Sequence, residues 1–182
     1  NIKLNNININ PTRDGILIAL EKMGADITIY NKRKNNNEMI CDIEVRSSIL
    51  KGCELNEDIA KLMIDEYPIL SIAASFAKSP SIFRGLGELR VKESDRLSLI
   101  KNNLINCGVE CKVDKDDLYI FPKKNFKINK KIIRTDFDHR IAMAFAVMGT
   151  KIGPLKIEDS ESINTSFPNF KNAINNLGGK IT

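Results

Sequence analysis

Apolar residues lie one, four and eight positions before each of three glycines spread along the chain. The glycines are Gly24, Gly108 and Gly178, and the apolar residues before them are Met23, Leu20 and Ile16; Cys107, Leu104 and Ile100; and Leu177, Ile174 and Phe170. These spacings place the apolar side chains on one face of an α-helix. A glycine directly after that face is typical of a helix C-terminus, where left-handed backbone is needed. The pattern therefore predicts three helices that each end at a glycine.

Alternating apolar positions follow the three glycines. Ile27, Cys111 and Ile181 each lie three residues after their glycine, and Ile29 and Val113 take the next alternate position. Alternation of this kind is the period of a half-buried strand. We therefore predict a helix–glycine–strand repeat around residues 12–30, 94–113 and 167–182. The alternative explanation is coincidence between ordinary amphipathic helices.

Further apolar runs complete the order of elements. Strands are predicted at residues 1–10, 39–48, 80–86, 117–124 and 154–159, and alanine-rich central helices at 67–79 and 140–150. The strands at 39–48 and 117–124 each form a hairpin with the strand before them. The order helix, strand, strand, helix, strand then repeats along the chain. This order predicts one α/β domain over residues 1–182 with pseudo-threefold architecture, sheets outside and helices inside.

Composition narrows the class of partner. The chain has 182 residues, of which 42% are hydrophobic, which is enough for one real core. Its net charge of +5 suits anionic ligands but is too weak to indicate nucleic acid. No apolar run approaches the ~18 residues of a membrane span, so no membrane partner is expected. The chain opens in a predicted strand without an initiator Met, and we expect a domain cut from a longer protein.

The four cysteines indicate a reducing setting. They are Cys41, Cys53, Cys107 and Cys111, and none forms a Cys-x-x-Cys pair. The single histidine, His139, is far from them in sequence, so a zinc site is not expected. No signal peptide is visible. A cytoplasmic protein without a metal site is therefore the expectation.

The segment RVKESDRL, residues 90–97, concentrates charge at the predicted start of the second repeat helix. Helix N-termini favour anions, so capping alone explains Glu93 and Asp95. Lys92 and Arg96 are unfavourable at a helix start and need a negative partner. Either the neighbouring acids or a bound ligand supplies that charge, and the residues alone leave both open.

Two other predicted helices start with charged residues. In DFDHRIAMAF, Asp138 is a good N-cap, and Arg140 stands beside an almost uncharged run. A guanidinium at the end of a buried helix usually grips a carboxylate or a phosphate. In MIDEYPIL, Asp65 and Glu66 precede Pro68 and an apolar helix. In a pseudo-threefold frame these helix starts can converge, and they would then form an anion site with acid and base groups.

The segments ELRVKESDRL, DHRIAMAFAVMG, MIDEYPILSIAASFA and INTSFPNF together closely resemble the EPSP synthase family, and the resemblance covers essentially all 182 residues. It implies two similar domains, each an inverse αβ prism of three βαβαββ units, with the active site in the cleft between them. The chain resembles the C-terminal portion. The implied reaction transfers the enolpyruvyl group of phosphoenolpyruvate to the 5-hydroxyl of shikimate 3-phosphate and releases phosphate, in aromatic amino-acid biosynthesis. The resemblance implies no metal or organic cofactor, a monomer, and the N-terminal portion of the same enzyme as partner.

The resemblance also implies roles for individual residues. Asp65 matches an aspartate that contacts the shikimate hydroxyls and accepts a proton. Glu93 matches the donor of a proton to the methylene carbon of phosphoenolpyruvate. Lys92 matches a substrate-binding lysine that shares in the proton transfers. These roles suit the chemistry, because addition to an enol ether needs a proton for carbon and a base for the attacking oxygen.

Two arginines complete the implied site, and two other positions depart from the family pattern. Arg96 and Arg140 match arginines that grip phosphoenolpyruvate, and His139 matches a supporting or structural position. Glu88 stands where part of the family has an Asn that contacts the shikimate phosphate. Thr165 stands where some members have a phosphate-contacting lysine. Neither Glu88 nor Thr165 is therefore expected to bind substrate.

Two alternatives remain at this point. The first is an enzyme like UDP-N-acetylglucosamine enolpyruvyl transferase, which has the same fold and the same donor. The KESDR and DHR segments favour the shikimate enzyme, whereas a cysteine in a catalytic loop would favour the other. The second alternative is a non-catalytic binding domain of the same fold. Because the motif residues are intact, degeneration is disfavoured, but the isolated chain is expected to be inactive.

Overall fold

The structure is a computed structural model that describes residues 1–123 and 127–182. The chain begins with β1 (Ile2–Asn8), α1 (Gly15–Lys22), β2 (Asp26–Asn35) and β3 (Glu38–Arg46). It continues with β4 (Glu54–Leu55), α2 (Glu57–Met63), the 3-10 helix η1 (Ile64–Glu66), α3 (Tyr67–Ser75), β5 (Ser81–Phe83), the 3-10 helix η2 (Gly87–Val91), α4 (Arg96–Asn106), β6 (Glu110–Asp114) and β7 (Asp117–Phe121). It ends with β8 (Ile132–Ile133), α5 (His139–Ile152), β9 (Lys156–Ile157), the 3-10 helix η3 (Ser160–Thr165) and α6 (Phe170–Asn176).

Within the described residues, the strands form three separate sheets whose pairing repeats. In the largest sheet the order is β4-β5-β7-β6, with β4 parallel to β5 and with β7 antiparallel to both β5 and β6. The first sheet, β1-β3-β2, reproduces the antiparallel part of that order, and the third, β8-β9, reproduces its parallel pair. The elements from β4 to β7 therefore make one complete βαβαββ unit, flanked by matching parts of two others. The predicted α/β fold of repeated units is confirmed.

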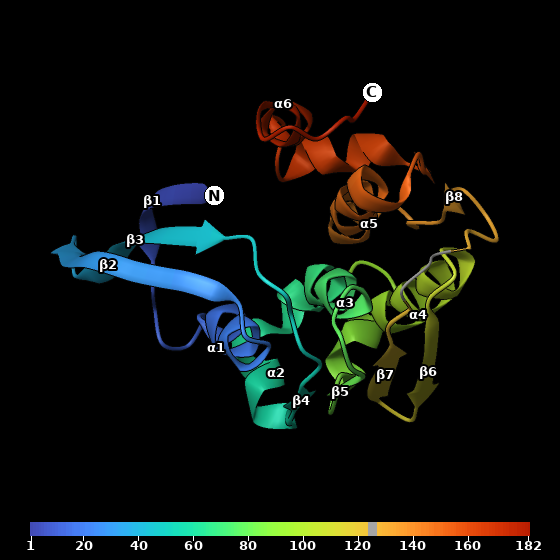
Figure 1. Cartoon of the computed structure of the whole chain (residues 1–182), viewed down its shortest axis with the longest axis horizontal. Helices are drawn as coiled ribbons and strands as arrows, with labels where there is room; N and C mark the ends of the chain where they lie inside the picture. Colours follow the sequence, from blue (N-terminus) through green and yellow to red (C-terminus); the bar gives the residue numbers. More distant parts are fainter. Residues whose placement is uncertain (124–126) are drawn as a thin grey trace.

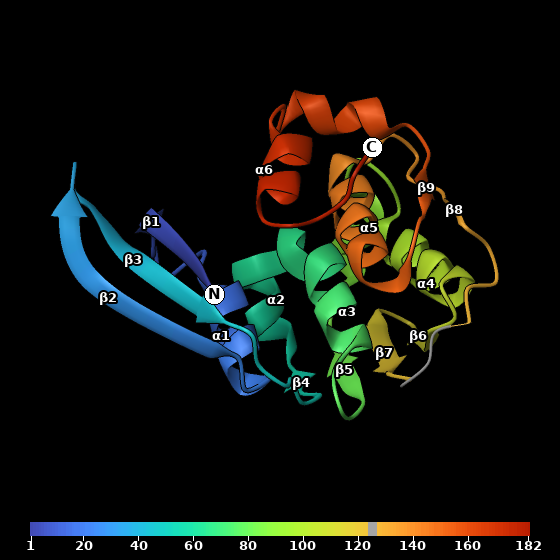
Figure 2. The ribbon, with the colours of Figure 1, turned by 45° about the horizontal axis from the view of Figure 1, so that its top comes forward.

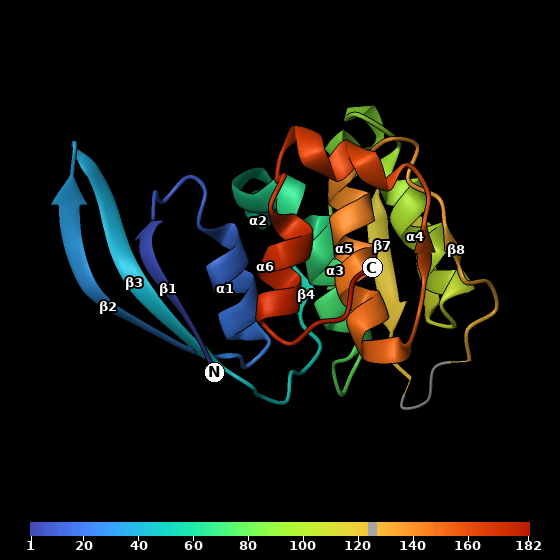
Figure 3. The same cartoon turned by 90° about the horizontal axis from the view of Figure 1, so that it is seen from above.

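The helices pack between the sheets. Figure 1 shows the first sheet to one side, the β4–β7 sheet below and β8 at the other side, with α3 and α5 between them. The same layering is visible from the other two directions in Figures 2 and 3. α3 and α5 carry buried small residues, among them Ala74, Ala142 and Ala144, which let the two helices approach closely. No helix in the described part of the chain is long and apolar enough to cross a membrane.

Gly24, Gly108 and Gly178 end α1, α4 and α6 with positive φ angles of 79°, 86° and 92°. β2 and β6 follow the first two glycines, as predicted. The third repeat differs, because the predicted strand at Ile181 is absent. There the Ile181 N–H donates to Asn175 Oδ1, and Asn175 Nδ2 donates to the Ile181 carbonyl. The side chain of Asn175 thus occupies the backbone groups that a neighbouring strand would pair.

Several element boundaries also differ from those predicted. The helix expected over 67–79 ends at Ser75, and its last turn tightens through bonds from Phe76 N–H to the Ala73 carbonyl and from Ala77 N–H to the Ala74 carbonyl. Pro80 follows closely and disfavours helical backbone before it. The strands expected over 80–86 and 154–159 are shorter. Within these ranges only the residues of β5 and β9 pair with a neighbouring strand. The strand expected over 117–124 ends at Phe121, and position 124 lies outside the described residues.

Candidate active site

A cluster of charged side chains forms where η1, the loop before α4 and the start of α5 meet. Arg96, the first residue of α4, lies at its centre with a side chain only 1% exposed. Its Nε donates to Asp138 Oδ2 at 2.7 Å and its Nη1 to Asp65 Oδ1 at 2.9 Å. Its Nη2 donates to Glu93 Oε2. We call Asp65, Lys92, Glu93, Arg96, Asp138 and Arg140 the charged cluster.

Capping places the two helix starts in this cluster. Asp95 is the N-cap of α4, where its carboxylate accepts from the backbone N–H of Ser98 at 3.0 Å. Asp138 is the N-cap of α5, and its Oδ1 accepts from the N–H groups of Arg140 and Ile141 at 2.9 and 3.4 Å. The N-cap predicted for Asp138 is therefore confirmed. Each cap satisfies N–H groups that have no partner within the helix.

Asp138 is fully buried and has a second set of partners. Its Oδ2 accepts from Arg96 Nε and also from Ser94 Oγ at 2.9 Å. Burial alone would raise the pKa of Asp138, but the hydrogen bond and charge of Arg96, together with the bonds from Ser94 and the Arg140 N–H, hold it below its usual value. Asp138 is therefore a buried carboxylate that stays ionised.

Lys92 lies between two carboxylates. Its Nζ contacts Glu88 Oε1 and lies 3.7 Å from Asp65 Oδ1. The hydrogen bond to Glu88 raises the pKa of Lys92 above its usual value. Partial burial lowers this pKa, and the nearby charge of Asp65 raises it. Lys92 is therefore a fixed cation at neutral pH. Glu88 therefore neutralises part of the charge of this lysine.

Arg140 is the most loosely held member of the charged cluster. Its Nη1 donates to the Asp65 backbone carbonyl at 3.2 Å, and its Nη2 is 3.9 Å from Asp65 Oδ2. Its side chain is 34% exposed, so the guanidinium keeps donors for a ligand. His139 is the first residue of α5 and is partly buried, and its side chain makes no hydrogen bond within the described residues.

The structure shows in part whether neighbouring acids or a ligand offset the positive charges at the helix starts. Three carboxylates surround Arg96, so internal acids offset its charge. Lys92 and Arg140 are partly exposed and can still meet an anion. All six residues predicted for the site lie in or beside the cluster.

The sequence pattern identified Asp138 only as a helix cap and gave Ser94 no role. A fully buried arginine needs more than one partner, but the burial of Arg96 is known only from the fold.

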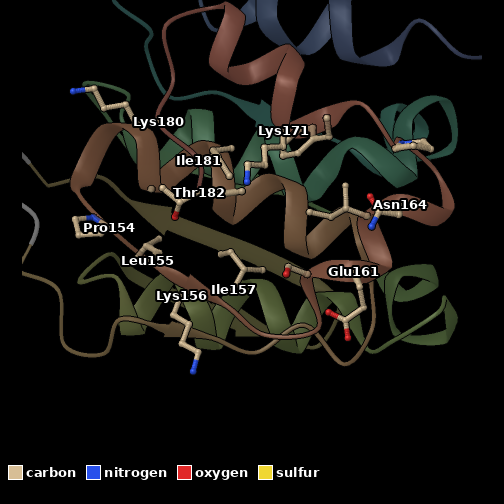
Figure 4. A pocket seen from close by; sticks show the side chains of 16 residues that line it. Pro154, Leu155, Lys156, Ile157, Glu161, Asn164, Lys171, Lys180, Ile181 and Thr182 are labelled. Atoms are coloured by element: carbon tan, nitrogen blue, oxygen red, sulfur yellow. The ribbon is translucent and has the colours of Figure 1, made fainter.

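A hollow of about 650 Å³ lies elsewhere, between α5, β9, η3 and α6 (Figure 4). Its lining includes Leu155, Ile157 and Phe170, and it contains no residue of the charged cluster. The side chains of Lys156 and Lys180 point away from the other lining residues (Figure 4). This hollow contains none of the residues predicted for the site, and the candidate site remains the charged cluster.

Comparison with known proteins gives a consistent answer. The model of the family EPSP synthase (3-phosphoshikimate 1-carboxyvinyltransferase) matches residues 1–174. The chain is 46% identical over its whole length to the 3-phosphoshikimate 1-carboxyvinyltransferase of Paramagnetospirillum magneticum and 43% identical to that of a Chelativorans species. An EPSP synthase structure from Acinetobacter baumannii covers 96% of the chain with a TM-score of 0.88 and 39% identity. The chain spans only 41%, 40% and 41% of these three proteins.

Proposed function

Because the chain belongs to the EPSP synthase family, we propose that it forms one wall of an active site that transfers an enolpyruvyl group from phosphoenolpyruvate to the 5-hydroxyl of shikimate 3-phosphate. One observation carries this proposal: the buried guanidinium of Arg96 joins Asp65, Glu93 and Asp138. Lys92 Nζ and Arg140 Nη2 lie 3.7 and 3.9 Å from the carboxylate of Asp65, so two further cations share this site. The remainder of the active site is proposed to lie in the N-terminal portion of a longer protein.

The proposed reaction needs one acid and one base. The 5-hydroxyl oxygen bonds to C2 of phosphoenolpyruvate while a proton is added to its C3 methylene. A proton is then lost from C3 as the C2–O bond to phosphate breaks, which restores the double bond and releases phosphate. We assign the hydroxyl proton to Asp65 and the C3 proton to Glu93. Glu93 suits this role because its side chain is 54% exposed, so a substrate can reach it.

The cations are proposed to hold the charges of phosphoenolpyruvate. Arg140 has free donors for a bidentate contact with a carboxylate or phosphate, and Lys92 supplies a point charge beside Asp65. Arg96 uses three of its five N–H donors on carboxylates. The contact with substrate proposed for Arg96 uses its two remaining N–H donors. His139 is proposed to support this group from the start of α5.

The remaining parts of the proposal concern setting and partners. We propose a monomeric cytoplasmic enzyme that uses no metal or organic cofactor. The four cysteines, all within the described residues, are unpaired, which suits a reducing compartment. Aromatic amino-acid biosynthesis is the pathway implied by the family.

The test is phosphate release by the longer protein. Release should require both phosphoenolpyruvate and shikimate 3-phosphate. UDP-N-acetylglucosamine in place of shikimate 3-phosphate is the matched control, since it is the acceptor of the related enolpyruvyl transferase. Phosphate release with UDP-N-acetylglucosamine but not with shikimate 3-phosphate would overturn the substrate assignment. No phosphate release with either acceptor would favour a binding domain.

A further inference from the structure

Ser94 and Asp138 lie behind the proposed acid, and we propose that they are positioning residues for Glu93. This inference rests on the proposed function. Ser94 directly follows Glu93, and its Oγ donates to Asp138 Oδ2. The same oxygen accepts from Arg96 Nε, and Arg96 in turn contacts Glu93. A single buried carboxylate oxygen thus holds both the backbone next to Glu93 and the guanidinium that binds the Glu93 side chain.

Capping of α5 does not explain this arrangement. Asp138 caps the helix with Oδ1, whereas the bonds to Ser94 and Arg96 use Oδ2. Neutral serine or asparagine caps a helix about as well as aspartate. Burying a carboxylate is unfavourable unless it is paired and hydrogen-bonded. The negative charge therefore has a function beyond the cap, which is to fix Arg96.

Glu93 needs such a fixed partner because little else restrains it. Its side chain is 54% exposed, and its contact with Arg96 is its one ion pair in the described chain. If Arg96 turned, the Glu93 carboxyl would lose its orientation toward a substrate. Small displacements of an acid from the atom it protonates are costly in rate. Ser94 and Asp138 should therefore affect turnover more than substrate affinity.

The experiment uses the longer protein and a matched pair of serine variants. Ser94→Ala removes the bond to Asp138, and Ser98→Ala removes the bond from Ser98 Oγ to Asp95 at 2.7 Å, which does not touch Arg96. For Ser94→Ala we expect kcat to fall about 10-fold with both KM values within about twofold, as for a lost bond to a charged group. Ser98→Ala should stay within about twofold in kcat, and Ser94→Thr, which keeps the hydroxyl, should restore turnover. Equal kcat values for Ser94→Ala and Ser98→Ala would overturn the proposal.

A second readout is independent of activity. In protein with 15N-labelled arginine, the Arg96 Nε–H signal, assigned by its loss in Arg96→Lys, should exchange slowly with solvent. Asp138→Asn keeps a capping oxygen but loses the charge, so this exchange should speed up at least about 10-fold, whereas Ser98→Ala should leave it unchanged. Unchanged exchange in Asp138→Asn would overturn the proposal. If the wild-type protein releases no phosphate while the exchange result holds, the proposed function fails and the positioning of Arg96 stands.

Discussion

Arg96 Nη1 lies 2.9 Å from Asp65 Oδ1, although 31 positions separate the two residues in the chain. The same guanidinium contacts Glu93 through Nη2. One buried cation therefore links the two carboxylates proposed as base and acid.

The first prediction concerns Glu93. Glu93→Gln keeps an oxygen for Arg96 but has no carboxyl proton to donate. In the longer protein we expect kcat to fall about 10²–10⁴-fold, the usual loss for one acid or base group, with smaller changes in substrate binding. Steady-state kinetics provide the measurement, and Glu110→Gln on the exposed strand β6 is the control. Turnover within a few-fold of wild type would remove Glu93 from the mechanism.

The second prediction concerns Arg140. Arg140→Lys keeps the charge but loses the planar fork that binds a carboxylate with two bonds. We expect the KM for phosphoenolpyruvate to rise about 10-fold or more, as for a lost charge-assisted bond. The KM for shikimate 3-phosphate should change less. If only the melting temperature changes, Arg140 acts as a structural residue at the start of α5.

The third prediction concerns Asp42, a buried residue of β3. The Asn6 N–H at 2.9 Å, the Asn31 amide at 2.8 Å and Arg33 at 3.2 Å donate to its carboxylate. These bonds, that of Asn6 first, lower the pKa of Asp42 to about 2. Its unfolded pKa is about 3.9, so the stabilisation is complete above about pH 4 and is lost as pH falls toward about 2.

Urea unfolding across this acid range tests the third prediction. The free energy of unfolding of the wild-type chain should fall more steeply than that of Asp42→Asn, so that the difference between them narrows with acidification. Asp26→Asn, an exposed change on the neighbouring strand β2 with the same loss of charge, is the control. Parallel curves for wild type and Asp42→Asn would show that these bonds do not stabilise the ionised carboxylate.

The fourth prediction compares two glycines with similar backbone. Gly24 and Gly108 have φ angles of 79° and 86°, but a Cβ on Gly24 would meet no atom within 4 Å, whereas one on Gly108 would lie 2.3 Å from the Lys127 carbonyl oxygen. Gly24→Ala should lower the free energy of unfolding by about 1–2 kcal/mol through left-handed strain alone. Gly108→Ala should lose about 1–3 kcal/mol more through overpacking. Equal losses would contradict the close approach at Gly108.

Local features of the fold could be predicted from the sequence, and long-range features could not. Gly24 and Gly108 follow helical apolar faces, and spacing alone reveals both helix ends. The missing strand at Ile181 could not be foreseen, because whether a strand forms depends on a neighbour with free backbone groups. Here the side chain of Asn175 takes those groups first.

The candidate site could likewise be predicted only in part from the sequence. Charged residues at helix starts indicated which segments contribute to the site, because helix starts follow from the local rule of capping. The partners of Arg96 depend on tertiary packing, because Asp138 lies 42 positions away in the chain. The sequence pattern left open whether acids or a ligand offset this arginine. The role of the Ser94 hydroxyl also needs the fold, since a serine beside a cap has many possible partners.

The central claim is that this chain supplies one wall of a two-walled active site. In an isolated wall, Lys92 and Arg140 face solvent, where high dielectric weakens their contacts with a ligand. Closure around both substrates is what excludes water and completes such a site. The chain alone should therefore bind phosphoenolpyruvate only weakly, with a dissociation constant on the order of millimolar.

Phosphate release from phosphoenolpyruvate and shikimate 3-phosphate tests this claim most directly. It is measured for the 182-residue chain alone, and for the chain mixed with the separately produced N-terminal portion of the longer protein. We predict no release above background from the chain alone and clear release from the mixture, which is abolished when the chain carries Glu93→Gln. Robust turnover by the chain alone would contradict the two-walled site.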